Sequence, residues 1–352
     1  MLRSVALLLL GSLIIFVSSL LASTAFAVQS TLKTTLAQPA AVSPESISPV
    51  NDTIKAQLAA GKLVALGDVH GSSYVVAQLI DFLQHEANWQ QVDDIAVEFG
   101  NARYQALADR FIVQGDDIAM AEVRHIWRDT LYFMAWQYDV YEQLVLTLRQ
   151  LNQTRHHKVR LVLAEPALDW RTLTAAGWQQ QVAAREQGYS DLIAREIIGQ
   201  NRSGILLFGT FHFIRQPVTL ANGKPFRSVA AMLNTTYPNK LYTLWPRMAN
   251  DGVAPIAEQQ APYVITLAQA PFGELPFSQI SRRIAASESA TLAQVADGYH
   301  YLKSTARNAP ISTAAQTDAA WHRELKRRAN IVGGRSGEQI NLWLQQHDGA
   351  HE

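Results

Sequence analysis

The stretch LVALGDVHG, residues 63–71, decides the fold and points to a site. The apolar run at residues 62–67 lies between two glycines, and it predicts a buried β-strand. The strand stops at the carboxylate of Asp68, and the imidazole of His70 follows two residues later. Residues 72–86 then carry apolar side chains at helical spacing. A buried strand followed by a helix is the first half of a βαβ unit, with the acid and the histidine at its turn.

The same alternation continues outward along the chain. Three further apolar runs predict strands at residues 94–99, 159–164 and 204–209. Helical spacing recurs at residues 102–114, 117–134, 138–152 and 178–200. Strands that alternate with helices predict an α/β fold with a mainly parallel β-sheet flanked by helices.

The part of the chain after Phe213 has a less regular pattern. Apolar runs predict strands at 240–245 and 263–267, and two helices are predicted at 318–329 and 337–346, separated by two glycines. We therefore expect one α/β domain over residues 54–305 and an irregular, helical C-terminal extension over residues 306–352.

Composition excludes several classes of protein. The 352 residues are long enough for a large buried core, and 30 Lys and Arg balance 30 Asp and Glu. No overall basic field is present to bind nucleic acid. The absence of cysteine excludes disulfides, thiolate nucleophiles and cysteine-ligated metal clusters.

The N-terminus carries the pattern of an export signal. Arg3 precedes a mostly apolar run at residues 5–21, and Ala25-Phe26-Ala27 has the small-residue spacing of a cleavage site. We expect a signal peptide over residues 1–27, although the run is almost long enough to be an uncleaved anchor. A flexible lead-in rich in Ala, Ser, Thr and Pro is expected over residues 28–53. The mature protein would be periplasmic or secreted, without a stable membrane span.

Every predicted strand of the first half is followed by an ionisable side chain. In an open α/β sheet, ligands bind beyond the carboxyl ends of the strands. Each residue also has a plainer interpretation, since Asp68 could cap the next helix and His212 could be packed in the core. Their recurrence at one sheet edge nevertheless predicts a site. The side chains that follow the four strands are Asp68 and His70, then Glu98, then Glu165 and Asp169, then His212.

One explanation of the opening stretch is a metal-dependent phosphatase. The segment Gly67-Asp68-Val69-His70-Gly71 matches the first block of the calcineurin-like metallophosphoesterases, in which Asp and His bind a two-metal centre. The later blocks of that family are missing, because Gly115-Asp116-Asp117 is not followed by Asp-Arg-Gly and Gly100-Asn101 is followed by alanine. This alternative is therefore disfavoured.

The order of the motifs along the chain fits another group of proteins better. The sequence resembles the ChaN-like group of the broad erythromycin esterase, ChaN and Tiki superfamily over about residues 62–213. Its first motif, G-E-x-H, is present with Asp68 in place of Glu. The matching segments are Gly67 to His70, Val97-Glu98-Phe99, then Gln105, Asp109 and Gly115, then helices at 127–136 and 138–152, and finally Gly209 to His212.

This resemblance implies two kinds of function. Erythromycin esterase relatives are hydrolases with a His and Glu site, and Tiki proteins are metal-dependent proteases, which implies a hydrolase of ester or amide bonds in a small molecule or a peptide. Two carboxylates and two imidazoles can hold one divalent metal ion or can activate water without one. We expect His70 to be the general base or a ligand, Asp68 and Glu98 to be orienting or metal-binding carboxylates, and His212 to be a second ligand or an acid.

The alternative is a haem-binding or metal-binding periplasmic protein of the ChaN type. Haem needs an apolar pocket and an axial His or Tyr. The candidates are His212, or Tyr299 and His300 in the aromatic segment at residues 297–301. The cofactor therefore stays open at this point between none, a divalent metal and haem.

Overall fold

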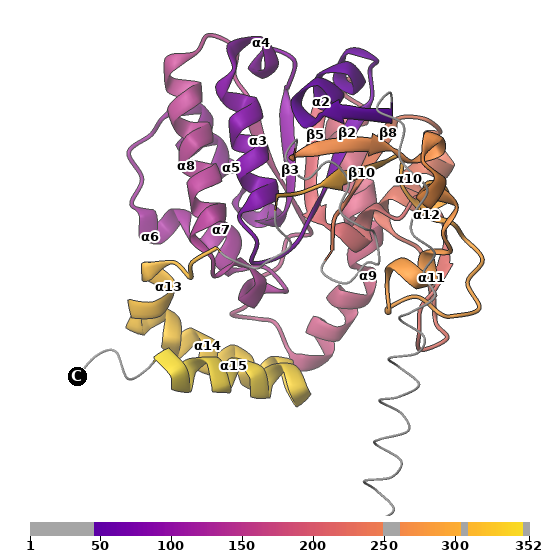
Figure 1. Ribbon diagram of the computed structural model, residues 1–352. Coiled ribbons are helices and arrows are strands. Elements are labelled where there is room, and N and C mark those ends of the chain that lie inside the picture. The colour runs from indigo at the N-terminus through magenta and orange to yellow at the C-terminus, as the bar shows by residue number, and fades with distance from the viewer. Residues whose placement is uncertain (1–45, 249–260, 304–308, 348–352) are drawn as a thin grey trace, which may run out of the picture. The chain divides into compact units, whose positions relative to one another are not determined.

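The computed structural model describes residues 46–248, 261–303 and 309–347 (Figure 1). The predicted signal peptide and most of the predicted lead-in lie outside the described residues. Regular structure nevertheless begins before Ile54. Strand β1 (Ile47–Pro49) pairs with a later strand of the main sheet, and helix α2 (Val50–Ala59) follows it directly. The boundary expected at residue 53 is therefore too late.

An eight-stranded sheet forms the centre of the fold. Its strand order is β1-β9-β10-β8-β2-β5-β3-β4, and only β9 runs against the other strands. A two-stranded sheet lies apart from it, formed by β6 (Val218–Thr219) and β7 (Pro225–Phe226). The bounds of the other strands in the main sheet are β2 (Leu63–Asp68), β3 (Asp94–Asn101), β4 (Arg160–Glu165), β5 (Gly204–Gly209), β8 (Leu241–Pro246), β9 (Tyr263–Thr266) and β10 (Gly298–Tyr301).

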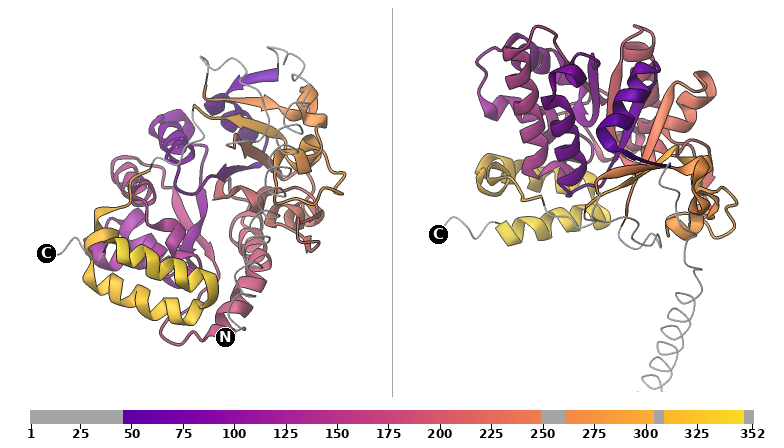
Figure 2. Two further views of the ribbon diagram at one scale, coloured as in Figure 1. Left: turned by 60° about the horizontal axis from the view of Figure 1, so that its bottom comes forward. Right: turned by 45° about the horizontal axis from the view of Figure 1, so that its top comes forward.

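Helices cover both faces of this sheet (Figures 1 and 2). Alternate residues of a strand point to opposite faces. Val64 and Leu66 of β2 accordingly pack with helices α2, α3 and α8, whereas Leu63 and Ala65 pack with helices α9 and α10. The longer helices are α3 (Tyr74–Gln84), α8 (Asp139–Thr154), α9 (Ala175–Ile193), α10 (Val229–Thr236), α14 (Ala319–Val332) and α15 (Gly334–His347). The α/β fold with a mainly parallel sheet is confirmed.

Short helices fill the connections between these elements. The segment 117–134, predicted as one helix, is broken into α6, α7 and a loop that leads to the 3₁₀-helix η5 (Phe133–Trp136). Among the residues that the structure describes, no helix is long and apolar enough to cross a membrane. The remaining short α-helices are α4 (Glu86–Trp89), α5 (Gln105–Ala108), α6 (Met120–Val123), α7 (His125–Arg128), α11 (Phe277–Ile280), α12 (Leu292–Val295) and α13 (Thr313–Thr317).

The C-terminal helices α14 and α15 form a hairpin (Figures 1 and 2). Gly333 joins them with a φ of 61°, a conformation that glycine adopts without strain. Arg328 of α14 is buried and forms an ion pair with Asp129, while its guanidinium stacks on the rings of Phe133 and Trp170. The hairpin therefore holds the loop between α7 and α8 in place.

Gln105 closes the edge of the sheet at β4. Its side-chain amide donates to the carbonyl of Leu161 and accepts from the backbone N–H of Leu163. These are the groups that a neighbouring strand would otherwise pair with. Gln105 and Asp109, two of the residues that carry the family resemblance, also form a hydrogen bond of 2.9 Å, so this motif has a structural role at the sheet edge.

Candidate active site

Three adjacent strands bring four of the predicted side chains together. Strands β2, β5 and β3 are neighbours and run parallel. Asp68 ends β2, Glu98 lies near the carboxyl end of β3, and His212 lies on the 3₁₀-helix η7 (Thr210–Phe213) that directly follows β5. Because parallel strands end at one edge, residues far apart in the sequence meet there.

The carboxylate of Glu98 connects the two histidines. Its Oε1 lies 3.0 Å from Nε2 of His70, and its Oε2 lies 2.8 Å from Nε2 of His212. The backbone N–H of Gly209 also donates to Oε2 over 3.0 Å. A buried carboxylate is costly unless it is paired and hydrogen-bonded, and these three contacts supply that pairing.

His212 is enclosed between two carboxylates. Its Nε2 faces Glu98, and its Nδ1 lies 2.8 Å from an oxygen of Glu186 on helix α9. The edge of the Tyr189 ring packs on the imidazole. Burial would lower the pKa of His212, but the two carboxylates outweigh it and raise the pKa to about 9. His212 is therefore a buried cation at neutral pH.

His70 is the more accessible of the two imidazoles, with 33% of its side chain exposed. Its ring packs edge-on against Trp136, with 4.6 Å between the ring centroids. Burial opposes its charging, but contact with Glu98 outweighs this and raises the pKa of His70 above its ordinary value. Because Nε2 faces Glu98, Nδ1 is the nitrogen left to exchange a proton with a ligand.

Gly209 allows His70 to approach Glu98. A Cβ atom at this position would lie 2.7 Å from Nε2 of His70 and 3.5 Å from Oε1 of Glu98. Such a distance is far inside van der Waals contact, so any larger residue would displace the imidazole. The glycine at the end of β5 is thus part of the geometry of the site.

Asp68 provides a second carboxylate to the same place. Its Oδ2 accepts a hydrogen bond of 2.8 Å from the hydroxyl of Tyr141 on α8, and Oδ1 is buried without a hydrogen-bond partner among the described residues. Burial raises the pKa of Asp68, partly opposed by His70 and Tyr141. Thr210 also donates to the backbone carbonyl of Asp68 over 2.9 Å, which ties β2 to η7.

These groups line a cleft of about 510 Å³. Two arginines line it as well, Arg185 from α9 and Arg283 from the segment after α11. The guanidinium of Arg283 stacks on Phe211, and no carboxylate of the described residues pairs with it. A cleft that combines a partly exposed imidazole with a guanidinium that pairs with no described carboxylate can both accept a proton and stabilise a developing negative charge.

The structure does not arrange the predicted ligands around a metal ion. Among the described residues, no group of three or more His, Asp and Glu side chains could hold one. The reason is visible at His212, whose two nitrogens both face carboxylates, so neither is free to coordinate. Glu98 is likewise engaged on both oxygens. In this arrangement Asp68, His70, Glu98 and His212 therefore do not form a metal site.

The alternative candidates for a haem ligand lie in different parts of the fold. Tyr299 and His300 lie on β10, are fully buried, and do not line the cleft that contains His212. Burial lowers the pKa of His300 to about 4, and neither of its ring nitrogens has a hydrogen-bond partner among the described residues. Both residues belong to the buried core at β10.

The remaining acidic candidates lie outside the cleft. Glu165 is buried behind it, where it accepts from the backbone N–H of Leu131 and the hydroxyl of Tyr189, and burial raises its pKa to about 8. Asp169 pairs with Arg171 near the surface. These two residues therefore have structural roles.

Sequence reasoning missed four residues of the site. Glu186 and Arg185 lie on α9, Tyr141 lies on α8, and Arg283 lies in the irregular part of the chain. Arg185, Glu186 and Arg283 line the cleft and Tyr141 contacts Asp68, in each case through packing rather than from the end of a strand. In the sequence, the pair Arg185-Glu186 is typical of the solvent-exposed face of a helix.

Among the comparisons with known proteins, only the one with solved structures found similar proteins. No family model and no curated protein matches the sequence. The chain is similar to a succinoglycan biosynthesis protein, with a TM-score of 0.49 and 9% identity over 79% of this chain and 97% of that one. It is similar to a protein from Bacillus cereus, with a TM-score of 0.46 and 11% identity over 75% of this chain and 94% of that one.

A mutant of the erythromycin esterase EreC in its open conformation is another similar structure. The TM-score is 0.49 and the identity 9%, over 74% of this chain and 95% of that one. At 9–11% identity, function has to be argued from the residues of the cleft.

Proposed function

We propose that this chain is a hydrolase of ester or amide bonds, in which His70 is the general base. The observation that carries the proposal is the bridge of Glu98 between a partly exposed His70 and a buried His212. A carboxylate that faces one nitrogen of an imidazole orients the ring and stabilises its protonated form. The other nitrogen of His70 is then ready to take a proton.

The reaction balances with water as the nucleophile. Water attacks the carbonyl carbon of the substrate while its proton moves to Nδ1 of His70. The negative charge that forms on the carbonyl oxygen is stabilised by the guanidinium of Arg283. When the tetrahedral intermediate collapses, the alcohol or amine leaves and takes the proton back from His70, so the histidine ends in its starting state.

His212 and Asp68 have separate roles in this scheme. His212 acts as a positioning residue, because its buried positive charge keeps Glu98 ionised and in place between the two imidazoles. Oδ1 of Asp68 is left to bind the attacking water or the leaving group, since Tyr141 occupies Oδ2. The roles first expected are therefore divided: Glu98 orients the base, and Asp68 faces the ligand.

The test is a panel of aryl ester and amide substrates with the purified protein in the presence of a chelator. Activity should persist with the chelator, fall by about 10²–10⁴-fold in His70→Ala, and stay unchanged in His156→Ala, whose imidazole is exposed. Hydrolysis that needs added metal, or that survives His70→Ala, would contradict the proposal.

The location of the protein is also a proposal. The N-terminal pattern supports export to the periplasm or the medium, as predicted from residues 1–27. Fractionation of cells that produce the full chain tests this, and a protein of undiminished mass in the cytoplasmic fraction would contradict it.

A further inference from the structure

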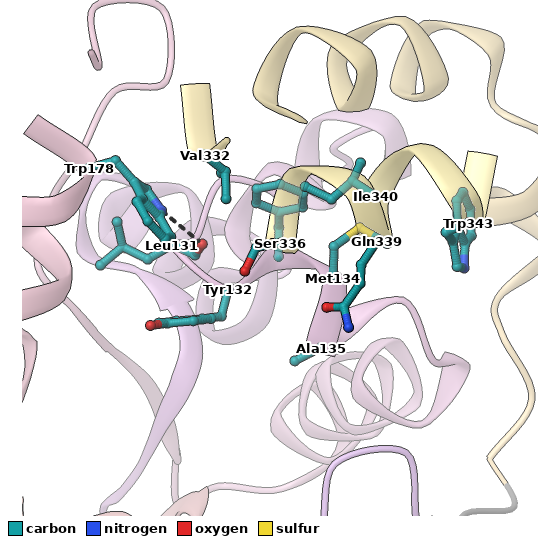
Figure 3. A pocket seen from close by; sticks show the side chains of 11 residues that line it. Leu131, Tyr132, Met134, Ala135, Trp178, Val332, Ser336, Gln339, Ile340 and Trp343 are labelled. Carbon is teal, nitrogen blue, oxygen red and sulfur yellow. Dashed lines mark hydrogen bonds between the residues drawn. The ribbon is translucent and has the colours of Figure 1, made fainter. Parts of the chain in front are cut away.

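A second cavity adjoins the cleft of the candidate active site. It has a volume of about 310 Å³ and lies between the loop at residues 131–135 and the C-terminal helix α15 (Figure 3). Tyr132 and Ala135 line both this cavity and the cleft. These two residues therefore form a wall that the two spaces share. We call this second cavity the apolar pocket.

The chemistry of the apolar pocket is uniform. None of its lining residues carries a charge, and its only polar side chains besides Tyr132 and the two tryptophans are Ser336 and Gln339. Burial of an apolar group is favourable in such a place, whereas burial of a charged group would be costly. The lining residues are Leu131, Tyr132, Phe133, Met134, Ala135, Trp178, Val332, Ser336, Gln339, Ile340 and Trp343.

Two tryptophans stand among the residues that line the apolar pocket. Figure 3 shows Trp178 and Trp343 at its opposite ends, with Ser336 and Ile340 of α15 between them. Trp178 is held by a hydrogen bond of 3.5 Å from its indole N–H to the carbonyl of Leu131. An uncharged space lined mainly by apolar side chains fits a hydrocarbon chain better than a charged group.

Contacts within the protein hold the walls of the apolar pocket in place before any ligand binds. The loop at residues 131–135 is anchored by Arg328, which pairs with Asp129 and stacks on Phe133. Helix α15 packs along α14 through buried residues such as Ile340 and Leu344. A site that is already formed loses little free energy to ordering when a ligand enters.

We infer that the apolar pocket binds the acyl chain of the substrate whose ester or amide bond is cleaved in the cleft, an inference that rests on the proposed function. The substrate class is then an acyl ester or acyl amide with a linear hydrocarbon chain. Polar groups at the reacting bond face His70 and Arg283, and the chain lies past Tyr132 along α15.

The first experiment measures kcat/KM for p-nitrophenyl esters from acetate to dodecanoate. Each methylene that enters the apolar pocket should raise kcat/KM by about fourfold. In Ser336→Trp, an indole introduced at an exposed position should fill the apolar pocket. The long esters should lose this gain, while the acetate ester keeps its rate.

Asn341→Trp is the matched control, because Asn341 is exposed on the same helix and does not line the apolar pocket. It should keep the full dependence on chain length. Two results would overturn the inference: Ser336→Trp with an unchanged dependence on chain length, or the same loss of rate on acetate as on dodecanoate.

A binding measurement separates this inference from the proposed function. Dodecanoate, added to the full chain carrying His70→Ala, should change the tryptophan fluorescence, because Trp178 and Trp343 line the apolar pocket. The change should be smaller in the additional variant Trp343→Phe. Binding without any ester hydrolysis by the unaltered protein would support the apolar pocket and contradict the hydrolase. No fluorescence change would overturn the apolar pocket as an acyl-chain site.

Discussion

Nε2 of His70 lies 3.0 Å from Oε1 of Glu98, and both residues line the cleft. The carboxylate raises the pKa of this imidazole above its ordinary value, so the protein should need a somewhat higher pH before His70 is free to act as a base. The first two predictions test this relationship.

The substitution Glu98→Gln removes the charge and keeps the shape. We expect kcat/KM to fall by about 10²–10⁴-fold. The rising limb of the pH profile of kcat/KM should also move to lower pH, because the carboxylate no longer favours the protonated imidazole. Glu196→Gln, at a partly exposed glutamate beside Arg195, is the control and should leave both quantities unchanged. A profile that does not move would show that Glu98 does not act on His70.

Gly209→Ala tests the close approach of His70 to β5. The added Cβ would lie 2.7 Å from Nε2 of His70, so the imidazole must move. We expect about 10²-fold lower kcat/KM, since small displacements of a catalytic group have costs of that order. Gly177→Ala on α9, whose Cβ would meet only side-chain atoms at 3.3 Å, should retain full activity. Equal activity of the two variants would contradict the geometry.

The stability of the protein should fall at alkaline pH because of His212. Its pKa is about 9 in the folded chain and about 6.5 in an unfolded one, so its contribution is complete below pH 6.5 and is lost as the pH rises to 9. The free energy of unfolding should decrease by up to about 3 kcal/mol across this range. Urea unfolding at pH 6 and pH 9 measures it. His212→Asn should be less stable at pH 6 and should lack most of the alkaline decrease.

The contribution of His300 to the free energy of unfolding should be lost at acidic rather than alkaline pH. Its pKa is about 4 in the fold, below its ordinary value, so its stabilising contribution is present above pH 6.5 and is lost as the pH falls toward 4. Between pH 7 and pH 5, we expect His300 to account for a loss of about 2 kcal/mol. His300→Leu, in which no buried imidazole has to stay neutral, should show a shallower loss in urea unfolding. An identical acid dependence in both proteins would contradict this account.

The central strands could be predicted from the sequence because strands buried on both faces are continuous apolar runs, as β2 and β5 are. The same approach missed β10, whose short aromatic sequence Gly298-Tyr299-His300-Tyr301 was interpreted as a haem-ligand segment. The broken helix at 117–134 could not be foreseen, since its last part is held by contacts with the distant Arg328. Tertiary packing, rather than local propensity, determines such segments.

Of the candidate site, sequence reasoning reached the residues at strand ends and missed those on helices. Asp68, His70, Glu98 and His212 follow from the direction of the parallel strands. Glu186 does not, because its place beside His212 depends on how α9 packs on the sheet. The enclosure of His212 has the same origin, since the carboxylate of Glu186 that faces its second nitrogen was invisible in the sequence.

The side chain of Gln105 has a consequence for self-association. It satisfies the outward backbone groups of Leu161 and Leu163, so a second copy of the chain cannot extend the sheet by strand addition at these two positions. Replacing it with alanine would expose a template for intermolecular pairing, and the hazard would be fibril growth rather than loss of chemistry.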